Sequence, residues 1–249
     1  MKIAVCLKRV PDTVAKIVPG PDRKSIDETG IKFVLNPYDE FAVEEALARK
    51  EKAGAGETVA YAVGTDASQE TLRTALAMGI DRAVLLQSPG SADGFEIAKA
   101  LAGELANGGY DLILFGKMAV DDYNQQVGPM VAELLALPCV TSVAHLSITD
   151  GAVEAEREIE GGVEVVECRL PAVITCEKGL NNPRLPALKG IMAAKKKPLE
   201  TKPTAIGAGT IEVLGLELPK ERQAGRIVGE GADAVPELIR LLRTEAKVL

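Results

Sequence analysis

Apolar and polar residues alternate in blocks along the first 143 residues of the chain. Short runs that are apolar almost throughout occur at residues 2–8, 58–63, 82–87, 111–115 and 139–143. Runs of this kind are typical of strands buried on both faces of a parallel sheet. Stretches with helical periodicity lie between them, at about 37–52, 67–78, 94–107 and 125–136. This alternation predicts an α/β fold with a Rossmann-like, doubly wound, mostly parallel sheet.

Capping residues support the boundaries of these helices. Asn36 stands where it can cap the first helix, Pro37 suits the first helical turn, and Gly54 is placed to end the helix. Gly79 is placed to end the second helix in the same way.

The pattern changes after residue 143. Residues 144–170 predict a hairpin insertion, because Asp150-Gly151 and Gly161-Gly162 are turn signals, and residues 171–177 predict one more buried strand. Residues 179–210 have no clear periodicity and are rich in Pro and Lys.

A last helical pattern covers about 233–247, with Pro236 in its first turn. We therefore expect a compact domain over residues 1–190. The remaining residues, 191–249, are expected to form a C-terminal arm that packs on a partner.

Charge and composition exclude several classes of function. A formal net charge of −7 argues against nucleic acid as the partner, since binding the phosphate backbone of a nucleic acid needs a basic surface. No apolar stretch approaches the ~20 residues of a membrane span. With His145 as the single histidine, a two-histidine metal site is excluded and a hydrolytic triad is disfavoured. The cysteines are widely spaced, which predicts neither a disulfide framework nor a zinc site; they are Cys6, Cys139, Cys168 and Cys176.

Polar residues follow two of the predicted strands at the point where each strand ends. The first strand runs into Cys6-Leu7-Lys8-Arg9, and the fourth runs into GKMAVDDYNQQVGP at residues 116–129. In an open parallel sheet, ligands bind beyond the carboxyl ends of the strands where the strand order reverses. The sequence therefore predicts a binding crevice between these two segments.

The second of these segments has the parts of a nucleotide cradle. Gly116 allows the backbone to approach a ligand closely, and Asn124 to Gln126 stand at the beginning of a helix, where free N–H groups attract phosphate. Asp121 and Asp122 would repel phosphate, so we expect them to accept hydrogen bonds from ribose or from the loop backbone. The chain has no G-x-G-x-x-G or Walker motif, and no Ser-Gly-Gly-x-Asp-Ser loop of ATP pyrophosphatases. It is expected to bind a nucleotide without cleaving it.

A second candidate surface follows the last predicted strand. LNNPRLPALKGIM at residues 180–192 carries Leu185, Leu188 and Ile191 in a loop broken by Pro and Gly, and three lysines follow in AAKKKP. Apolar loop residues beside a basic run indicate a protein-docking surface. The lysine run taken alone is typical of a solvated helix end.

Several stretches in order along the chain resemble the small (β) subunit of the electron transfer flavoproteins. They are MKIAVCLKRVPDT, LNPYDEFAVEEAL, ETLRTALAMGIDRA, GKMAVDD with QVGPMVAELL, and REIEGGVEVVECRLPAVITCEKGLNNPR with IMAAKKKP. The resemblance covers the whole chain, and the spacing from Arg157 to Thr175 is its most specific part.

This resemblance implies an α/β heterodimer that carries electrons and is not itself a metabolic enzyme. The implied fold is of the adenine-nucleotide α-hydrolase type, with residues 191–249 on the large subunit. The α subunit would hold the redox FAD, while this chain would bury a structural AMP. The implied nucleotide contacts are Cys6, Asn36, Pro37, Tyr38, Asp39, Val63, Gly116, Asp121, Asp122, Tyr123, Asn124, Gln125, Gln126 and Val127.

The resemblance also implies a docking loop at residues 184–193 for acyl-CoA or other dehydrogenases, with a quinone oxidoreductase or another acceptor downstream, as in fatty acid oxidation. The implied docking residues are Arg184, Leu185, Leu188, Ile191 and Met192, with Leu188 as the anchor. The N-terminus, with no signal-type cleavage site, leads us to expect a bacterial or archaeal cytoplasmic protein; the mitochondrial matrix is expected for a eukaryotic one.

The loop that would hold the nucleotide leaves two alternatives open. Its second half, Gln126-Val127-Gly128-Pro129, is similar to electron-bifurcating members of the family, in which a second FAD replaces AMP and NADH is oxidised. Its first half carries Asp-Tyr-Asn where those members have Gly-Asp-Thr, and the bulky Tyr123 would fill space that a flavin needs. We favour AMP, with a second FAD as the alternative.

Overall fold

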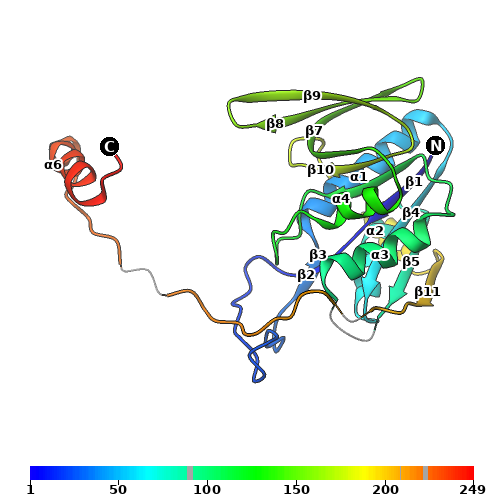
Figure 1. The fold of residues 1–249 in the computed structure, drawn as a ribbon, viewed down its shortest axis with the longest axis horizontal. Coiled ribbons are helices and arrows are strands. Elements are labelled where there is room, and N and C mark those ends of the chain that lie inside the picture. Colours follow the sequence, from blue (N-terminus) through cyan, green and yellow to red (C-terminus); the bar gives the residue numbers. More distant parts are fainter. Residues whose placement is uncertain (89–91, 208, 221–223) are drawn as a thin grey trace. The chain divides into compact units, whose positions relative to one another are not determined.

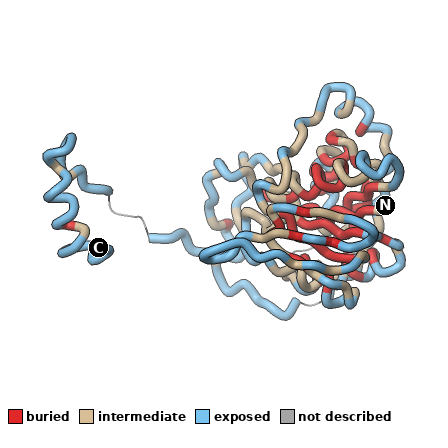
Figure 2. The backbone as a smooth tube through the Cα atoms, turned by 90° about the horizontal axis from the view of Figure 1, so that it is seen from above, coloured by how far each residue is buried: buried red, intermediate tan, exposed pale blue. Residues whose placement is uncertain are grey.

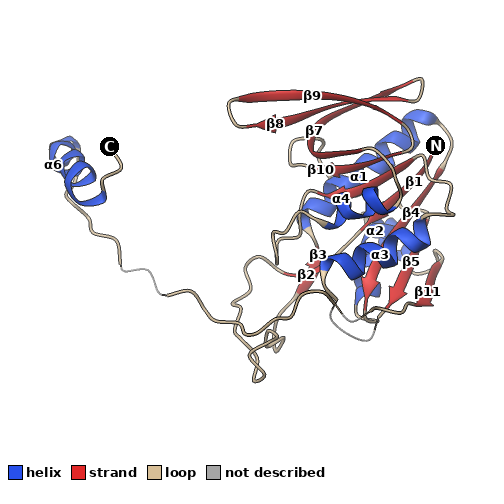
Figure 3. Cartoon of the chain, in the orientation of Figure 1, coloured by secondary structure: helices blue, strands red, loops and turns tan. Residues whose placement is uncertain are grey.

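The computed structural model describes residues 1–88, 92–207, 209–220 and 224–249 (Figures 1 and 3). The chain divides into two compact units. The first unit combines Met1–Ile17 with Glu28–Leu214, and the second combines Val18–Asp27 with Gly215–Leu249.

The first unit contains the α/β fold. Its strands are β1 (Lys2–Cys6), β2 (Arg9–Pro11), β3 (Phe33–Leu35), β4 (Glu57–Gly64), β5 (Arg82–Gln87), β6 (Leu112–Gly116), β7 (Cys139–Thr149), β8 (Ala152–Ile159), β9 (Gly162–Arg169), β10 (Ala172–Cys176) and β11 (Leu199–Pro203). Its helices are α1 (Pro37–Ala53), α2 (Ser68–Met78), α3 (Gly94–Leu105), α4 (Val127–Leu134) and α5 (Leu188–Ala194).

Within the described residues, nine strands form one sheet in the order β11-β5-β4-β1-β6-β10-β7-β8-β9. Neighbouring strands from β11 to β7 are parallel, whereas β7, β8 and β9 pair antiparallel. The predicted doubly wound, mostly parallel sheet is thereby confirmed. A separate antiparallel pair, β2 with β3, was not predicted, because its three-residue strands are too short to show periodicity.

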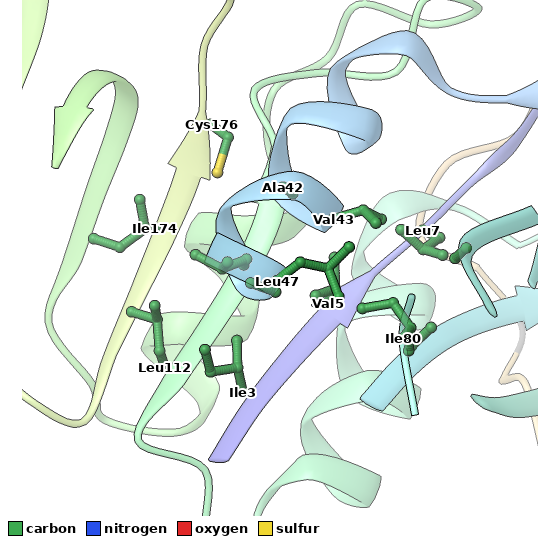
Figure 4. Close-up of a cluster of buried hydrophobic side chains, with 14 of the residues drawn as sticks. Ile3, Val5, Leu7, Ala42, Val43, Leu47, Ile80, Leu112, Ile174 and Cys176 are labelled. Atoms are coloured by element: carbon green, nitrogen blue, oxygen red, sulfur yellow. The ribbon is translucent and has the colours of Figure 1, made fainter. Parts of the chain in front are cut away.

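Two apolar cores cover the two faces of the central part of this sheet, which explains why strands β1, β4, β5, β6 and β10 are apolar almost throughout. Ile3 and Val5 of β1 pack with α1 and α2 on one face (Figure 4). Ala4 and Cys6, which point the other way, pack with α3 and α4. Buried segments are accordingly concentrated in the sheet and its covering helices (Figure 2).

The predicted helix ends are mostly confirmed. Pro37 occupies the first turn of α1, and Gly54 ends that helix in the left-handed conformation, with φ of 67°. Gly79 ends α2. The prediction that the Asn36 side chain caps α1 is wrong: Asn36 stands at the cap position, but its side chain makes no capping hydrogen bond.

The hairpin insertion is confirmed as an antiparallel meander of β7, β8 and β9. β7 begins parallel to β10, bends where its register shifts between Val143 and His145, and continues antiparallel to β8. Gly151 and Gly161 form the two turns with φ of 77° and 82°, a conformation that glycine adopts without steric cost. The single histidine, His145, is exposed on β7.

The region after residue 179 differs from the prediction, because it contains both α5 and β11. β11 pairs in parallel with β5, from Leu199 with Ala83 to Pro203 with Gln87, so the sheet continues beyond residue 190 and the first unit extends to Leu214. Sequence periodicity missed both elements for a physical reason. α5 has only seven residues and contains Gly190, so the apolar spacing of Leu188, Ile191 and Met192 is too short to predict a helix, and most side chains of β11 are exposed.

The second unit carries the predicted C-terminal helix. A 3₁₀ turn (Ala232–Ala234) leads into α6 (Val235–Leu241), with Pro236 in its first turn, and a π-helical segment (Leu242–Ala246) follows. Leu216 N donates to Arg23 O at 2.6 Å. Of the residues described in both units, none belongs to a helix long and apolar enough to cross a membrane.

Candidate functional site

The carboxyl ends of β1 and β6 meet where the strand order reverses. β1 lies between β4 and β6, with Cys6 in register with Phe115. The chain therefore leaves both strands at the same edge of the sheet, as the sequence predicts. A cavity of about 320 Å³ lies beyond these strand ends, within the size range of small-molecule pockets.

Most of the candidate contact residues line this cavity. They are Cys6, Asn36, Asp39, Val63, Gly116, Asp122, Asn124, Gln125, Gln126 and Val127. The other candidates, Pro37, Tyr38, Asp121 and Tyr123, are adjacent in sequence but do not line it. Tyr123 is 60% exposed, so its ring does not fill the cavity.

Other lining residues were missed by the reasoning from sequence. Gly64 ends β4 and Ser88 follows β5 at the same edge of the sheet, and the strand-end rule applied to those strands would have found them. Ile97 and Leu101 of α3 and Phe115 of β6 form an apolar wall. An apolar pair at i and i+4 cannot be distinguished from core in the sequence, so no signal identified α3 as part of the cavity.

The Asn36 side chain joins the start of α1 to the loop after β6. Its amide nitrogen donates to Asp39 Oδ1 at 2.8 Å and to Met118 O at 2.9 Å, and its amide oxygen accepts from Val120 N at 3.1 Å. All these hydrogen bonds of the buried amide are directed at the cavity wall, which is why the side chain does not cap the helix.

The Asp39 carboxylate joins three segments at the same place. It accepts from Lys8 N at 2.7 Å and from Gly116 N at 3.2 Å, in addition to Asn36. The loop after β1, the start of α1 and the end of β6 are therefore held together by one buried side chain.

Burial raises the pKa of the Asp39 carboxyl to about 7, against the opposing effect of its three hydrogen bonds. Burial, with a smaller effect of Asp39, also raises the pKa of the Cys6 thiol well above its ordinary value. Near pH 7 the Cys6 thiol is therefore uncharged and the Asp39 carboxyl is only about half ionised, which lessens the negative charge that an anionic ligand would meet.

Gly116 also has a packing role that the sequence did not predict. A Cβ atom at this position would lie 2.3 Å from Asp39 Oδ1 and 2.6 Å from the carbonyl carbon of Tyr38. The missing side chain thus allows the first turn of α1 to pack against the end of β6, and it shapes the cavity wall.

The two acidic residues of the loop are held by a lysine. Lys8 Nζ bonds Asp121 at 2.8 Å and Asp122 at 2.9 Å, and Asp122 also accepts from Asn124 N at 3.1 Å. Burial alone would lower the pKa of Lys8, but these carboxylates outweigh it and raise the pKa. The expected bond to loop backbone is present, and Lys8 is a partner that the sequence did not predict.

Helix α4 begins at the cavity. Its N-cap residue is Gln126, and Tyr123 and Gln125 reach it through left-handed backbone, with φ of 56° and 55°. The first N–H groups of a helix lack intrahelical partners, so those of Val127 and Gly128 are available to a ligand. Gly128 brings this turn close to the sheet, since a Cβ there would lie 2.8 Å from Thr175 Cγ2.

Cys6 is the cysteine that lines the cavity, and burial raises the pKa of its thiol, which disfavours a nucleophilic thiolate. Across residues 1–88, 92–207, 209–220 and 224–249, no set of three or more His, Cys, Asp or Glu side chains is arranged to hold a metal ion. All four cysteines are free, and His145 does not line the cavity.

Comparison with known proteins gives a consistent result. The model of the electron transfer flavoprotein domain family matches residues 24–206. Electron transfer flavoprotein subunit beta of Bacillus subtilis is 41% identical over 260 residues, covering 100% of both chains. The chain belongs to the electron transfer flavoprotein β-subunit family. The subunits of the same name from Syntrophomonas wolfei (41% identical, 100% of this chain and 98% of theirs) and Homo sapiens (38%, 96% of each) agree.

The candidate docking residues of this family member lie on and just before α5. Leu185 and Leu188 are 90% and 82% exposed, and Met192 and Ile191 are also exposed. Arg184 differs from them, because its guanidinium is bound by Glu44 and Glu51 of α1. The expected loop is thus partly helical, with its apolar side chains directed to solvent.

The lysine run after α5 is only partly a solvated helix end. Lys195 and Lys196 are exposed, as expected. Lys197 instead donates to Leu76 O at 3.0 Å and Ile80 O at 2.6 Å, at the end of α2. Identical residues in the run therefore have different roles, which the sequence pattern did not distinguish.

Proposed function

We propose that this chain is the β subunit of a heterodimeric electron transfer flavoprotein. It would carry electrons from dehydrogenases of the acyl-CoA type or similar towards a quinone-reducing or other acceptor. The redox FAD would belong to the α subunit, and this subunit would hold a structural AMP and support the FAD-bearing domain. The observation that carries the proposal is the cavity at the switch point, lined by most of the residues implied by the family resemblance.

The residues that line the cavity fit an adenine nucleotide. Ile97, Leu101 and Phe115 offer an apolar wall suited to a base, and the first turn of α4 offers free N–H groups suited to a phosphate. Asn124, Gln125 and Gln126 add polar groups to the lining of the cavity. AMP would contribute binding energy and order to the loop after β6, and no redox chemistry.

Analysis of bound nucleotides tests this assignment directly. The chain should be co-expressed with its α subunit, and the purified heterodimer denatured and its nucleotides separated and quantified. We expect one AMP and one FAD per heterodimer. Two FAD and no AMP would contradict a structural AMP in this subunit.

The second candidate is the β subunit of an electron-bifurcating flavoprotein, which would hold a second FAD here and oxidise NADH. The position of Tyr123 favours keeping this alternative, because its exposed ring leaves the cavity free of the obstruction expected from the sequence. The nucleotide analysis separates the two candidates, since the AMP half of FAD would compete for the same cavity.

We further propose that the exposed apolar residues of 184–193 dock the dehydrogenase. Leu185 and Leu188 are close in sequence to the exposed residues Lys189, Lys195 and Lys196. The matching partner surface would be an apolar pocket with an acidic rim.

Leu188→Ala should impair electron transfer from an acyl-CoA dehydrogenase without loss of nucleotide. We expect the apparent KM for the flavoprotein to rise about tenfold, the effect typical of removing an interface anchor. Leu134→Ala, which truncates an exposed leucine on α4, is the matched control and should leave the KM unchanged. Equal KM values for the two variants would refute the docking assignment.

A further inference from the structure

The segment that carries the exposed leucines is fixed to α1 at its beginning. Arg184 binds Glu44 through Nε at 2.8 Å and Nη2 at 2.8 Å, and its backbone N–H donates to the same carboxylate at 3.0 Å. Its Nη1 also binds Glu51 at 2.6 Å. Glu44 is buried and its carboxylate is therefore fixed in place. The bidentate hydrogen bond from Arg184 to this carboxylate sets the position of the backbone immediately before Leu185.

Asn181 adds a second link to the same helix. Its side-chain nitrogen donates to Phe41 O at 3.0 Å and to Glu45 Oε2 at 3.1 Å. Glu45 is itself buried and bound to Arg49. Two side chains placed three residues apart are therefore attached to successive positions of α1.

The other end of the segment is fixed to α2. Arg73 Nη1 donates to Ala194 O at 2.6 Å and Lys197 O at 2.8 Å, at the end of α5, while Lys197 Nζ binds the end of α2. Gly190 packs against α2 so closely that a Cβ there would lie 2.4 Å from Ala77 O. Leu185 and Leu188 project from a short span anchored on both sides.

We propose that Arg184 is a positioning residue that holds the Leu185–Leu188 span ready for the partner through the carboxylates of Glu44 and Glu51. The inference rests on the proposed docking function of this span. Arg184 would act through α1 and not by contact with the partner, because its guanidinium donors are directed at the two glutamates. Without Arg184, the span would have to become ordered when the partner binds, and the entropic cost of this ordering lowers the affinity.

The ordering is measurable without any partner. In the heterodimer, Arg184→Met keeps the apolar stem of the side chain and removes its donors. We expect the backbone amides of residues 191–194, which donate hydrogen bonds within α5, to exchange hydrogen about tenfold faster, with exchange in the β1 and β6 amides unchanged. Arg157→Met is the matched control, because it removes a similarly exposed arginine paired with Glu164 on the meander. It should leave exchange in 191–194 unaltered.

The same variants give a functional readout with an acyl-CoA dehydrogenase as the electron donor. For Arg184→Met we expect the apparent KM for the flavoprotein to rise about fivefold at unchanged kcat, since the cost lies in ordering the span before contact. Glu44→Gln should have a smaller effect of the same kind. The double variant should raise the apparent KM no further than Arg184→Met alone, because both changes break the same interaction.

The outcomes separate the two proposals. Unchanged exchange in 191–194 of Arg184→Met would overturn the positioning role, as would an unchanged KM in an assay where Leu188→Ala raises it. If Leu188→Ala has no effect on KM, the docking function fails, and the exchange measurement still decides whether Arg184 orders the span.

Discussion

Gly116→Ala is expected to destabilise the protein and to reduce its nucleotide content together. The new Cβ would lie 2.3 Å from Asp39 Oδ1, 2.6 Å from the carbonyl carbon of Tyr38 and 2.7 Å from Asp39 N. Two of these three contacts are with backbone atoms of α1, so rotation of a side chain cannot relieve them. The first turn of α1 must move away from β6, which we expect to cost about 3 kcal/mol of unfolding free energy.

Gly103→Ala is the matched control for this change. Gly103 lies in α3, where an added Cβ would have no neighbouring atom within 4 Å. Alanine in a helix interior is favoured over glycine by up to about 1 kcal/mol. Urea unfolding of each heterodimer at a fixed concentration, with nucleotide quantified per heterodimer, checks both variants. A Gly116→Ala protein with wild-type stability and full nucleotide content would show that α1 does not depend on this close approach.

The stability of the wild-type protein is expected to fall between pH 5 and 7 relative to Asp39→Asn. The pKa of Asp39 is about 7 in the folded protein, above the value of 3.8 for an unperturbed Asp, because the carboxyl is buried. Between these values the folded chain retains a proton that the unfolded chain has released. The contribution to stability is therefore fully present below pH 3.8 and is lost as pH rises through about 7. Over two pH units the loss should amount to about 2 kcal/mol.

The comparison with Asp39→Asn isolates this dependence on pH. The asparagine amide nitrogen would face the Lys8 N–H, which costs about 1–3 kcal/mol at every pH and so shifts the curve without changing its slope. The measurement is the free energy of unfolding of both heterodimers at intervals from pH 5 to 9. The difference should change up to about pH 7 and then level off. A constant difference across the range would mean that Asp39 does not retain its proton in the folded state.

The central part of the fold was predictable because its physical causes are local. Residues 82–87 are apolar on both faces, and Pro37 and Gly54 mark the ends of α1 through backbone preferences of their own. β11 was not predictable in this way. Its place in the sheet depends on backbone pairing with β5, more than a hundred residues earlier in the chain, and its exposed side chains leave no pattern.

The candidate site also has a part that the sequence predicts and a part that it does not. Strand order placed the cavity, and helix polarity placed Gln126 at its edge, since both rules refer to the ends of elements that the sequence reveals. The sequence did not predict which charged side chains pair with each other. Lys8 with Asp121, and Arg184 with Glu44, join residues far apart in sequence, and only the folded chain brings these charges together.

The position of β10 has a consequence for the order in which the chain can fold. β10 is made after β7 but lies between β6 and β7, parallel to both. While the chain emerges from the ribosome, β6 and β7 therefore each present an unpaired edge until residue 176 is available. A nascent chain that ends before this residue holds two separate half-sheets with exposed apolar edges, a state prone to association with other chains. Completion of the sheet centre is thus a late step of synthesis, and of the described strands only the outer strand β11 joins the sheet from a later part of the chain.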